Sequence, residues 1–144
     1  MRSLLLCLAL VSGLLPGRLA AADEEQKPAA EEAKAAALAW LALVDAGKYA
    51  DSWKAASSHF KAMVTEQKWT DAMNQVREPL GSVTKREFKS AEFTHVLPRA
   101  PKGDYWVILF ATNFDGTDAI ETVTPMLDKD GMWHVSGYYI KPPS

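Results

Sequence analysis

Two side chains in the C-terminal part of the chain, His134 and Glu121, are of types that carry out acid–base chemistry. They stand in "GMWHVSGYYIK" and "DAIETVTPML", which the sequence pattern predicts to be neighbouring strands joined by "DKDG". A histidine base oriented by a carboxylate needs both side chains on one face of the sheet and within hydrogen-bonding distance. They share a face only if the turn holds two or four residues. At roughly 3.4 Å per residue, their offset along the strands is too large for a direct bond.

His134 is therefore expected on a polar face of the sheet, which lies under a partner subunit or is open to water. Strict alternation places Ser136 and Tyr138 on the same face, and Val135 and Tyr139 on the opposite one.

Glu121 lies in an otherwise apolar segment, where a carboxylate could line a pocket. A solvent-facing position is the commoner one, because charges are rarely buried without a partner. Glu121 and His134 are the candidate ligand-binding residues, and no residue is expected to be catalytic.

The sequence contains no recognisable metal or cofactor motif. His59, His95 and His134 are far apart and lack H-x-H or H-E-x-x-H spacing, so no metal site is expected. The loops "NFDGTD" and "DKDG" lack the register and closing glutamate of a calcium-binding loop, and they indicate hairpin turns. No G-x-S-x-G, Walker or G-x-G-x-x-G motif occurs. The serine hydrolase, nucleotide hydrolase and dinucleotide-dependent classes therefore have no support, and no cofactor is expected.

The N-terminus has the pattern of a cleaved secretory signal. One basic residue precedes an apolar run over residues 4–15, a Pro-Gly pair follows, and the alanine triplet 20–22 fits the small-residue cleavage rule. The run is shorter than the roughly 18 residues that cross a bilayer, so cleavage before Asp23 is expected and no membrane span. Cleavage would remove Cys7, the one cysteine, and with it any disulfide or thiol chemistry.

The predicted signal, residues 1–22, carries two arginines and no acid, so its removal changes the net charge from −2 to −4. A mildly acidic chain with scattered lysines has no electrostatic footprint for nucleic acid or an anionic membrane. Residues 23–30 form an acidic, Ala-rich lead-in, and residues 31–144 are long enough for one domain with its own core.

The domain is predicted to begin with helices and to end with strands. Pro28 suits the first turn of the first helix, and Thr65 suits the N-cap of the third. Pro125 cannot donate to a sheet, so its strand should be irregular there. The predicted helical segments are 28–49, 49–60 and 65–81, and the predicted strands are 82–98, 104–114, 118–127 and 131–141.

The second strand is apolar enough to be covered on both faces. Short turns between consecutive strands predict an antiparallel meander, with the helices across one face of a curved sheet in an α+β fold.

Three segments, "WLALVDAGKYADSW", "VREPLGSVTKREF" and "ETVTPMLDKDGMWHVSGYYI", resemble a bacterial secreted family known as domain of unknown function 4019. That family is similar to the nuclear transport factor 2-like (cystatin-like cone) superfamily. The resemblance implies a cone of helices over a curved antiparallel sheet. The superfamily contains isomerases, dehydratases and non-enzymatic binders, so it does not choose a function. The family carries no catalytic motif, and no residue role is transferred.

The expectation is an exported cell-envelope domain, periplasmic or extracellular, that binds a small ligand or a partner protein without catalysis. A homodimer formed through the outer strand face is a further expectation. An isomerase- or dehydratase-like enzyme with an acid or base inside the cone is the alternative, and it requires an enclosed pocket of a few hundred Å³. A purely structural module would instead have a filled cone and a large apolar surface patch.

Overall fold

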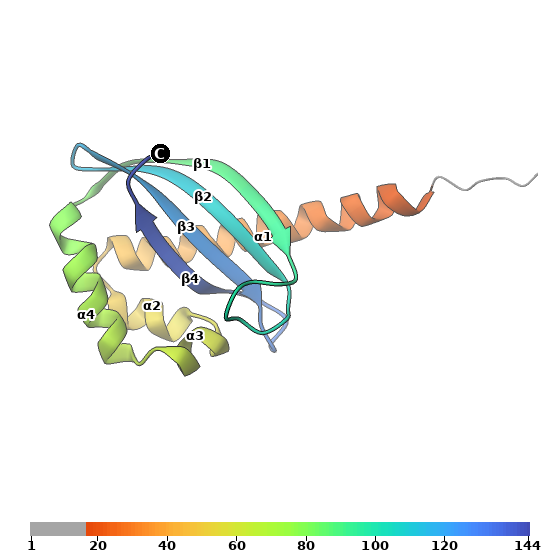
Figure 1. Ribbon diagram of the computed structural model, residues 1–144, viewed down its shortest axis with the longest axis horizontal. Coiled ribbons are helices and arrows are strands. Elements are labelled where there is room, and N and C mark those ends of the chain that lie inside the picture. The colour runs from red at the N-terminus through yellow and green to blue at the C-terminus, as the bar shows by residue number, and fades with distance from the viewer. Residues whose placement is uncertain (1–16) are drawn as a thin grey trace, which may run out of the picture.

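The computed structural model describes the backbone of residues 17–144 and the side chains from residue 29 onward. Most of the predicted signal, residues 1–16, lies outside the described residues. Helices come first and strands follow, as predicted (Figure 1). The elements are α1 (Gly17–Asp45), α2 (Tyr49–Ala55), α3 (Ser58–Met63), α4 (Glu66–Val76), a 3-10 turn η1 (Glu78–Leu80), β1 (Val83–Thr94), β2 (Tyr105–Phe114), β3 (Thr117–Leu127) and β4 (Trp133–Lys141).

The four strands form one antiparallel sheet in the order β1-β2-β3-β4, which confirms the predicted meander. Helix α1 crosses one face of the sheet and contacts β2, β3 and β4, while α2, α3 and α4 gather beside the β4 edge (Figure 1). All the helices thus lie on one face or at one edge of the sheet. We call the opposite face the open face.

Helix α1 begins at Gly17, so the prediction that it begins at Pro28 is wrong. A proline inside a helix removes one backbone hydrogen bond. The Ala-, Glu- and Gln-rich residues 20–27 favour helix strongly enough to continue it through that position. The lead-in, residues 23–30, is accordingly helical.

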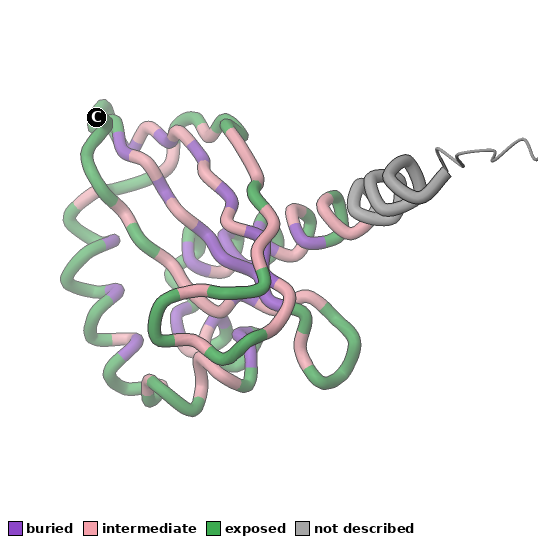
Figure 2. Tube along the Cα trace, turned by 45° about the vertical axis from the view of Figure 1, so that its right-hand side comes forward, coloured by how far each residue is buried: buried purple, intermediate pink, exposed green. Residues whose placement is uncertain are grey.

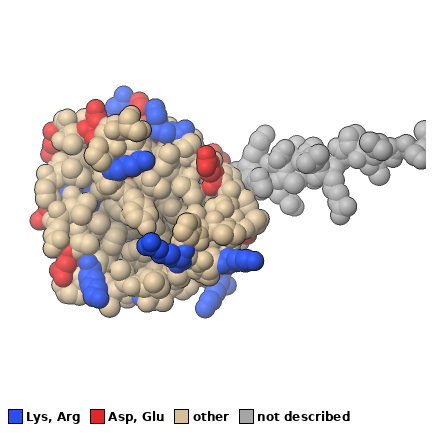
Figure 3. Space-filling view, in the orientation of Figure 1, with Lys and Arg blue, Asp and Glu red and all other residues tan. Residues whose placement is uncertain are grey.

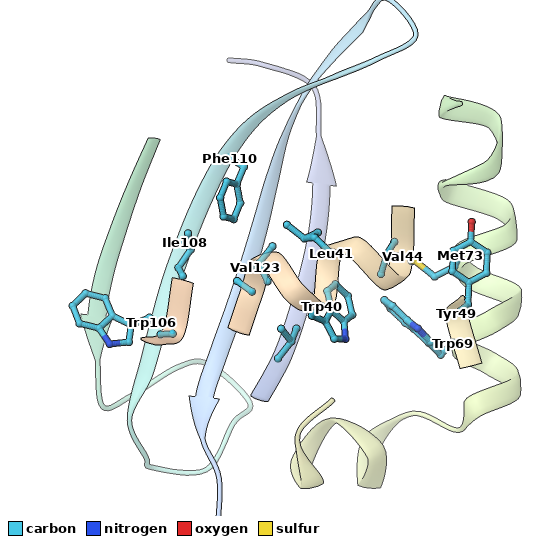
Figure 4. Packing of buried hydrophobic residues seen from close by; sticks show 13 residues of the cluster. Trp40, Leu41, Val44, Tyr49, Trp69, Met73, Trp106, Ile108, Phe110 and Val123 are labelled. Carbon is cyan, nitrogen blue, oxygen red and sulfur yellow. The ribbon is translucent and has the colours of Figure 1, made fainter. Parts of the chain in front are cut away.

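The core lies between α1 and the sheet and extends to α4 (Figures 2 and 4). Trp40 of α1 packs edge-on against Tyr138 at 5.2 Å and lies 5.7 Å from Trp69 of α4, measured between ring centroids. Both indole N–H groups are satisfied, because Trp40 donates to Ser52 O and Trp69 to Ser52 Oγ. The buried cluster contains Ala33, Ala37, Trp40, Leu41, Val44, Tyr49, Trp69, Met73, Trp106, Ile108, Phe110, Val123 and Val135.

The predicted second helix, 49–60, is in fact two helices. Ser57 interrupts it: its side chain accepts from Phe60 N and caps α3, and its backbone N–H donates to Val135 O of β4. Ser57 is completely buried. A serine that favours a cap over a helix interior therefore ends one helix and starts the next at the sheet edge.

Strand β4 has an irregularity where Pro125 meets it, as predicted from the missing proline donor. Thr124 is opposite Gly137, but Pro125 is opposite Val135, which leaves Ser136 as an extra residue. The bulge inverts the alternation beyond it. Tyr138 therefore packs with Val135 toward the helices.

The prediction that Tyr139 shares the face of Val135 is wrong, because Tyr139 is 71% exposed on the open face. Strand β2 also departs from expectation. One face is buried, and Val107, Leu109 and Ala111 on its other face are half-buried.

The β3–β4 turn is tied to the start of α3, and this contact makes the fold's stability depend on pH. Asp128 accepts from Ser58 Oγ at 2.6 Å and from Ser58 N at 2.7 Å. These two bonds lower the pKa of Asp128 from 3.8 to about 2. A lowered folded-state pKa stabilises the fold above the unfolded value, and the contribution is lost as pH falls through the folded value.

We predict that Asp128→Ala lowers the free energy of unfolding at pH 7 by about 1 kcal/mol, since the contact is partly screened by solvent. The difference from the unsubstituted protein should shrink between pH 4 and pH 2. Urea titrations over that pH range measure it. Ser58→Ala should show a smaller loss with the same pH dependence, and a difference that persists undiminished at pH 2 would contradict the assignment.

Candidate functional site

Glu121 lies on the helix-facing side of β3 and is completely buried. Its side chain accepts hydrogen bonds from Arg86 Nε at 2.8 Å, from Thr112 Oγ1 at 2.5 Å and from the Tyr138 hydroxyl. These donors come from β1, β2 and β4. One carboxylate therefore connects all four strands on the side that the helices cover.

Arg86 extends this network to the helices. Its Nη1 and Nη2 donate to the two carboxylate oxygens of Asp45, at the end of α1, at 2.7 and 3.0 Å. Asp45 also accepts from Arg77 Nη2 at 2.6 Å. Arg77 is 4% exposed, and its guanidinium lies 4.5 Å from the centre of the Phe114 ring. Two carboxylates and two guanidinium groups thus balance in charge where α1 and α4 end. We call these four residues the ion-pair cluster.

The cluster shifts two pKa values. Burial lowers the pKa of Arg86, but its bonds to Asp45 and Glu121 outweigh burial, and the net shift is upward. Burial and then the adjacent Glu121 charge raise the pKa of the Tyr138 hydroxyl. Arg86 therefore stays charged and Tyr138 stays protonated, so the hydroxyl remains a donor to the carboxylate.

The ion-pair cluster leaves Glu121 no access to a substrate. A solvent-facing side chain was expected from the sequence, whereas the structure buries Glu121 with three donors. Among the described residues, Glu121 lines neither of the grooves described below. Its role is to hold helix ends to the sheet. The sequence gives little signal for these contacts, because the donors stand 35, 9 and 17 residues away.

His134 does not meet Glu121. His134 is opposite Met126 in the sheet, whereas Glu121 is opposite Ile140. Its Nε2 lies 2.7 Å from Asp130 Oδ2 and its Nδ1 lies 3.1 Å from Ala55 O, so it joins the β3–β4 turn to the end of α2. The separation predicted for the pair is confirmed.

The other two histidines are also apart. His95 lies 2.8 Å from Asp104, where it closes the base of the β1–β2 loop. His59 lies on α3. Within the part of the chain that the structure describes, no three His, Cys, Asp or Glu side chains are placed to hold a metal ion.

A groove of about 480 Å³ lies on the open face, between α3, the β1–β2 loop and strands β2, β3 and β4. Thr122 and Thr124 line it beside Gly137, whose missing side chain keeps the floor low. The lining combines hydroxyl, aromatic and aliphatic groups with one arginine. Its residues are His59, Met63, Leu97, Pro98, Arg99, Ala100, Tyr105, Val107, Thr122, Thr124, Ser136, Gly137 and Tyr139.

The wall of this groove is the β1–β2 loop, and the loop is held by its own contacts. Gly103 N donates to His95 O at 3.1 Å, and the Tyr105 hydroxyl donates to Pro101 O at 2.6 Å. Burial raises the pKa of Tyr105, so the hydroxyl keeps its proton. Figure 3 shows the open face: most of it is uncharged, and the acidic side chains lie toward its rim.

This groove, including Arg99, was not predicted from the sequence. Arg99 has φ 60, a left-handed conformation. The segment "LPRAP" gives the one available signal, because a proline at the second position of a turn often precedes a residue with positive φ. Alternation along β4 could not reveal the groove, because the bulge reverses which side chains face it.

A second groove of about 310 Å³ lies at the other end of the open face. Two of its charged side chains, Lys85 and Glu87, pair with each other at 2.9 Å. The third, Asp118, accepts a hydrogen bond from Asn113 Nδ2 at 2.8 Å, so the charge without an ion-pair partner in this part of the described chain is negative, whereas in the first groove it is the positive charge of Arg99.

The fold and the groove together define a class: an α+β domain whose helices seal one face of an antiparallel meander and leave a hollow on the other. The chain belongs to the family described as Protein of unknown function (DUF4019), whose sequence model matches residues 36–138. The match begins within α1 and ends in β4 at Tyr138. This confirms the family resemblance drawn from the sequence.

No curated protein and no solved structure matches the chain. The similarity to the nuclear transport factor 2-like superfamily therefore stays a prediction. None of the helices in the described part of the chain has the length and apolar character needed to cross a membrane.

We predict that Glu121→Gln lowers the free energy of unfolding by about 3 kcal/mol, because it leaves buried Arg86 with half of its negative partners. Thr112→Val removes one donor and should cost about 1 kcal/mol. Urea unfolding followed by tryptophan fluorescence measures both changes. A Glu121→Gln protein as stable as the unsubstituted one would contradict the structural role of the cluster.

Proposed function

We propose that this chain is an exported, non-catalytic binding module that holds a small amphipathic molecule in the groove on its open face. The groove is the observation that carries the proposal. Its volume of about 480 Å³ falls within the roughly 300–1,000 Å³ of small-molecule sites. Its lining has the apolar majority and few polar groups that such sites share.

The chemistry of the lining supports binding over catalysis. It contains no Asp or Glu among the described residues, and His59 is its one imidazole. A general base is ordinarily oriented by a hydrogen-bonded partner, and in the described part of the chain no carboxylate lies within ion-pair distance of His59. Glu121, the acid that the enzyme alternative would use, faces the other side of the sheet and is occupied by three donors.

Export is the part of the proposal that rests on the sequence alone. The basic residue, the apolar run over residues 4–15 and the alanine triplet 20–22 favour a secretory signal. A module without disulfides in such a compartment relies on its packed core and on the ion-pair cluster for stability.

The test is a titration of the ¹⁵N-labelled chain, residues 23–144, with 4-phenylbutan-1-ol and with 4-phenylbutanoate. We expect saturable shifts of the amide signals of Val107, Thr124 and Tyr139 with at least one probe. Sedimentation equilibrium on the same sample shows whether the chain associates with a second copy. The absence of shifts with both probes, or shifts confined to the helices, would contradict the proposal.

We predict that Gly137→Val abolishes these shifts and leaves the melting temperature within a few degrees. A β-carbon at Gly137 would meet Thr124 Cβ at 3.6 Å and Thr124 Oγ1 at 3.8 Å, which are ordinary contacts, so the added methyl groups fill the floor of the groove. Valine also suits a strand. Ala111→Val is the matched control, because it adds bulk to the same sheet face outside this groove. Binding retained by Gly137→Val would place the ligand elsewhere.

A further inference from the structure

Arg99 occupies a backbone conformation that an arginine adopts at a cost. It is the third residue of the turn Leu97–Ala100, which is closed by Ala100 N donating to Leu97 O at 3.3 Å, and its φ is 60. Pro98 at the second position is typical of such turns, but a residue with positive φ at the third position is normally glycine or asparagine. Residues held in such conformations cluster at functional sites.

The Arg99 side chain lines the groove without a charged partner. No Asp or Glu of the described residues lies within ion-pair distance of it. The lining within residues 29–144 contains one Lys or Arg side chain and no carboxylate. The groove is thus a locally positive site in a chain whose net charge is −2. An unpaired guanidinium with five donors is suited to an oxyanion.

Hydroxyl groups face the same space. Thr122, Thr124 and Ser136 line the strand side of the groove, and each can donate a hydrogen bond to an anionic oxygen. Met63 and Val107 supply aliphatic surface. Tyr139, which is 71% exposed, presents an aromatic ring that has no packing role in the core.

From these features we infer that the ligand is a small amphipathic monoanion, with an apolar or aromatic body and one oxyanionic head group that Arg99 binds. This inference rests on the proposed function and names its ligand class. The β1–β2 loop presents Arg99 from an ordered wall, because the bonds from Gly103 to His95 and from Tyr105 to Pro101 fix that loop. Less ordering is then required on binding.

The test compares three probes with one skeleton: 4-phenylbutanoate, 4-phenylbutan-1-ol and protonated 4-phenylbutylamine. Amide-shift titrations give the three dissociation constants. We expect the carboxylate to bind about tenfold more tightly than the alcohol, because a charged hydrogen bond replaces a neutral one. The amine should bind more weakly than the alcohol. The advantage of the carboxylate should fall as salt is raised.

The variants separate charge from structure. Arg99→Gly and Arg99→Gln should both reduce carboxylate binding to the level of the alcohol. Arg99→Gly should also leave the melting temperature unchanged or raise it, because glycine adopts φ 60 without strain. Lys102→Gln is the matched control: it removes the same charge from the same loop outside the groove lining, and it should change carboxylate binding less than twofold.

The outcomes distinguish the two proposals. If the alcohol binds as tightly as the carboxylate, or Lys102→Gln weakens the carboxylate as much as Arg99→Gly, the monoanion inference is wrong and the binding groove stands. A marked fall in melting temperature for Arg99→Gly would also overturn it, because Arg99 would then be structural. If no probe binds, both proposals fail.

Discussion

The bond between Arg86 and Glu121 is the interaction on which the rest of the structure depends. A completely buried carboxylate is tolerated only with donors close at hand, because removing a charge from water costs several kcal/mol. Arg86 meets that need and reaches Asp45 with its other nitrogens. Asp45 in turn binds Arg77. Directional bonds therefore fix the end of α1 and the end of α4 relative to the sheet. The aromatic core fills the space between these elements and does not have to determine how they are placed.

The bulge in β4 links this buried cluster to the groove. Without the extra residue, strict alternation would put Tyr138 on the face opposite Val135 and away from Glu121. With it, Tyr138 turns inward to the carboxylate, Tyr139 turns outward, and Gly137 leaves the groove floor low. One irregularity, placed where Pro125 cannot donate, thus completes the core on one face and forms the hollow on the other. Polar side chains on the helix side of the sheet bind one another and stabilise the fold. The open face retains polar side chains that are free to bind a ligand.

Local chemistry made much of the fold predictable. The Thr65 cap, the meander and the irregular pairing at Pro125 each follow from one residue or one short pattern, and each is confirmed. Two features of the helices were not predicted. The extra length of α1 depends on helix propensity before Pro28, and the break at Ser57 depends on a tertiary bond to Val135. The predicted sheet faces of Tyr138 and Tyr139 are wrong for a further reason: one inserted residue moves every side chain beyond it to the opposite face of the sheet. The partners of Glu121 come from separate elements, so no sequence spacing predicts them.

The three arginines with described side chains show why the open face is the place to look for function. Arg77 and Arg86 are buried or nearly so, and carboxylates of the same chain neutralise them. Arg99 is exposed, lies in a strained turn and has no such neighbour in the described chain. A strained backbone persists when the surrounding structure holds it or when a side-chain interaction offsets its cost. The hydrogen bonds of the β1–β2 loop are made by its neighbours, from His95 to Tyr105, and they would hold a glycine at this position equally well. What distinguishes arginine from glycine there is the guanidinium itself, and the space it faces is the groove.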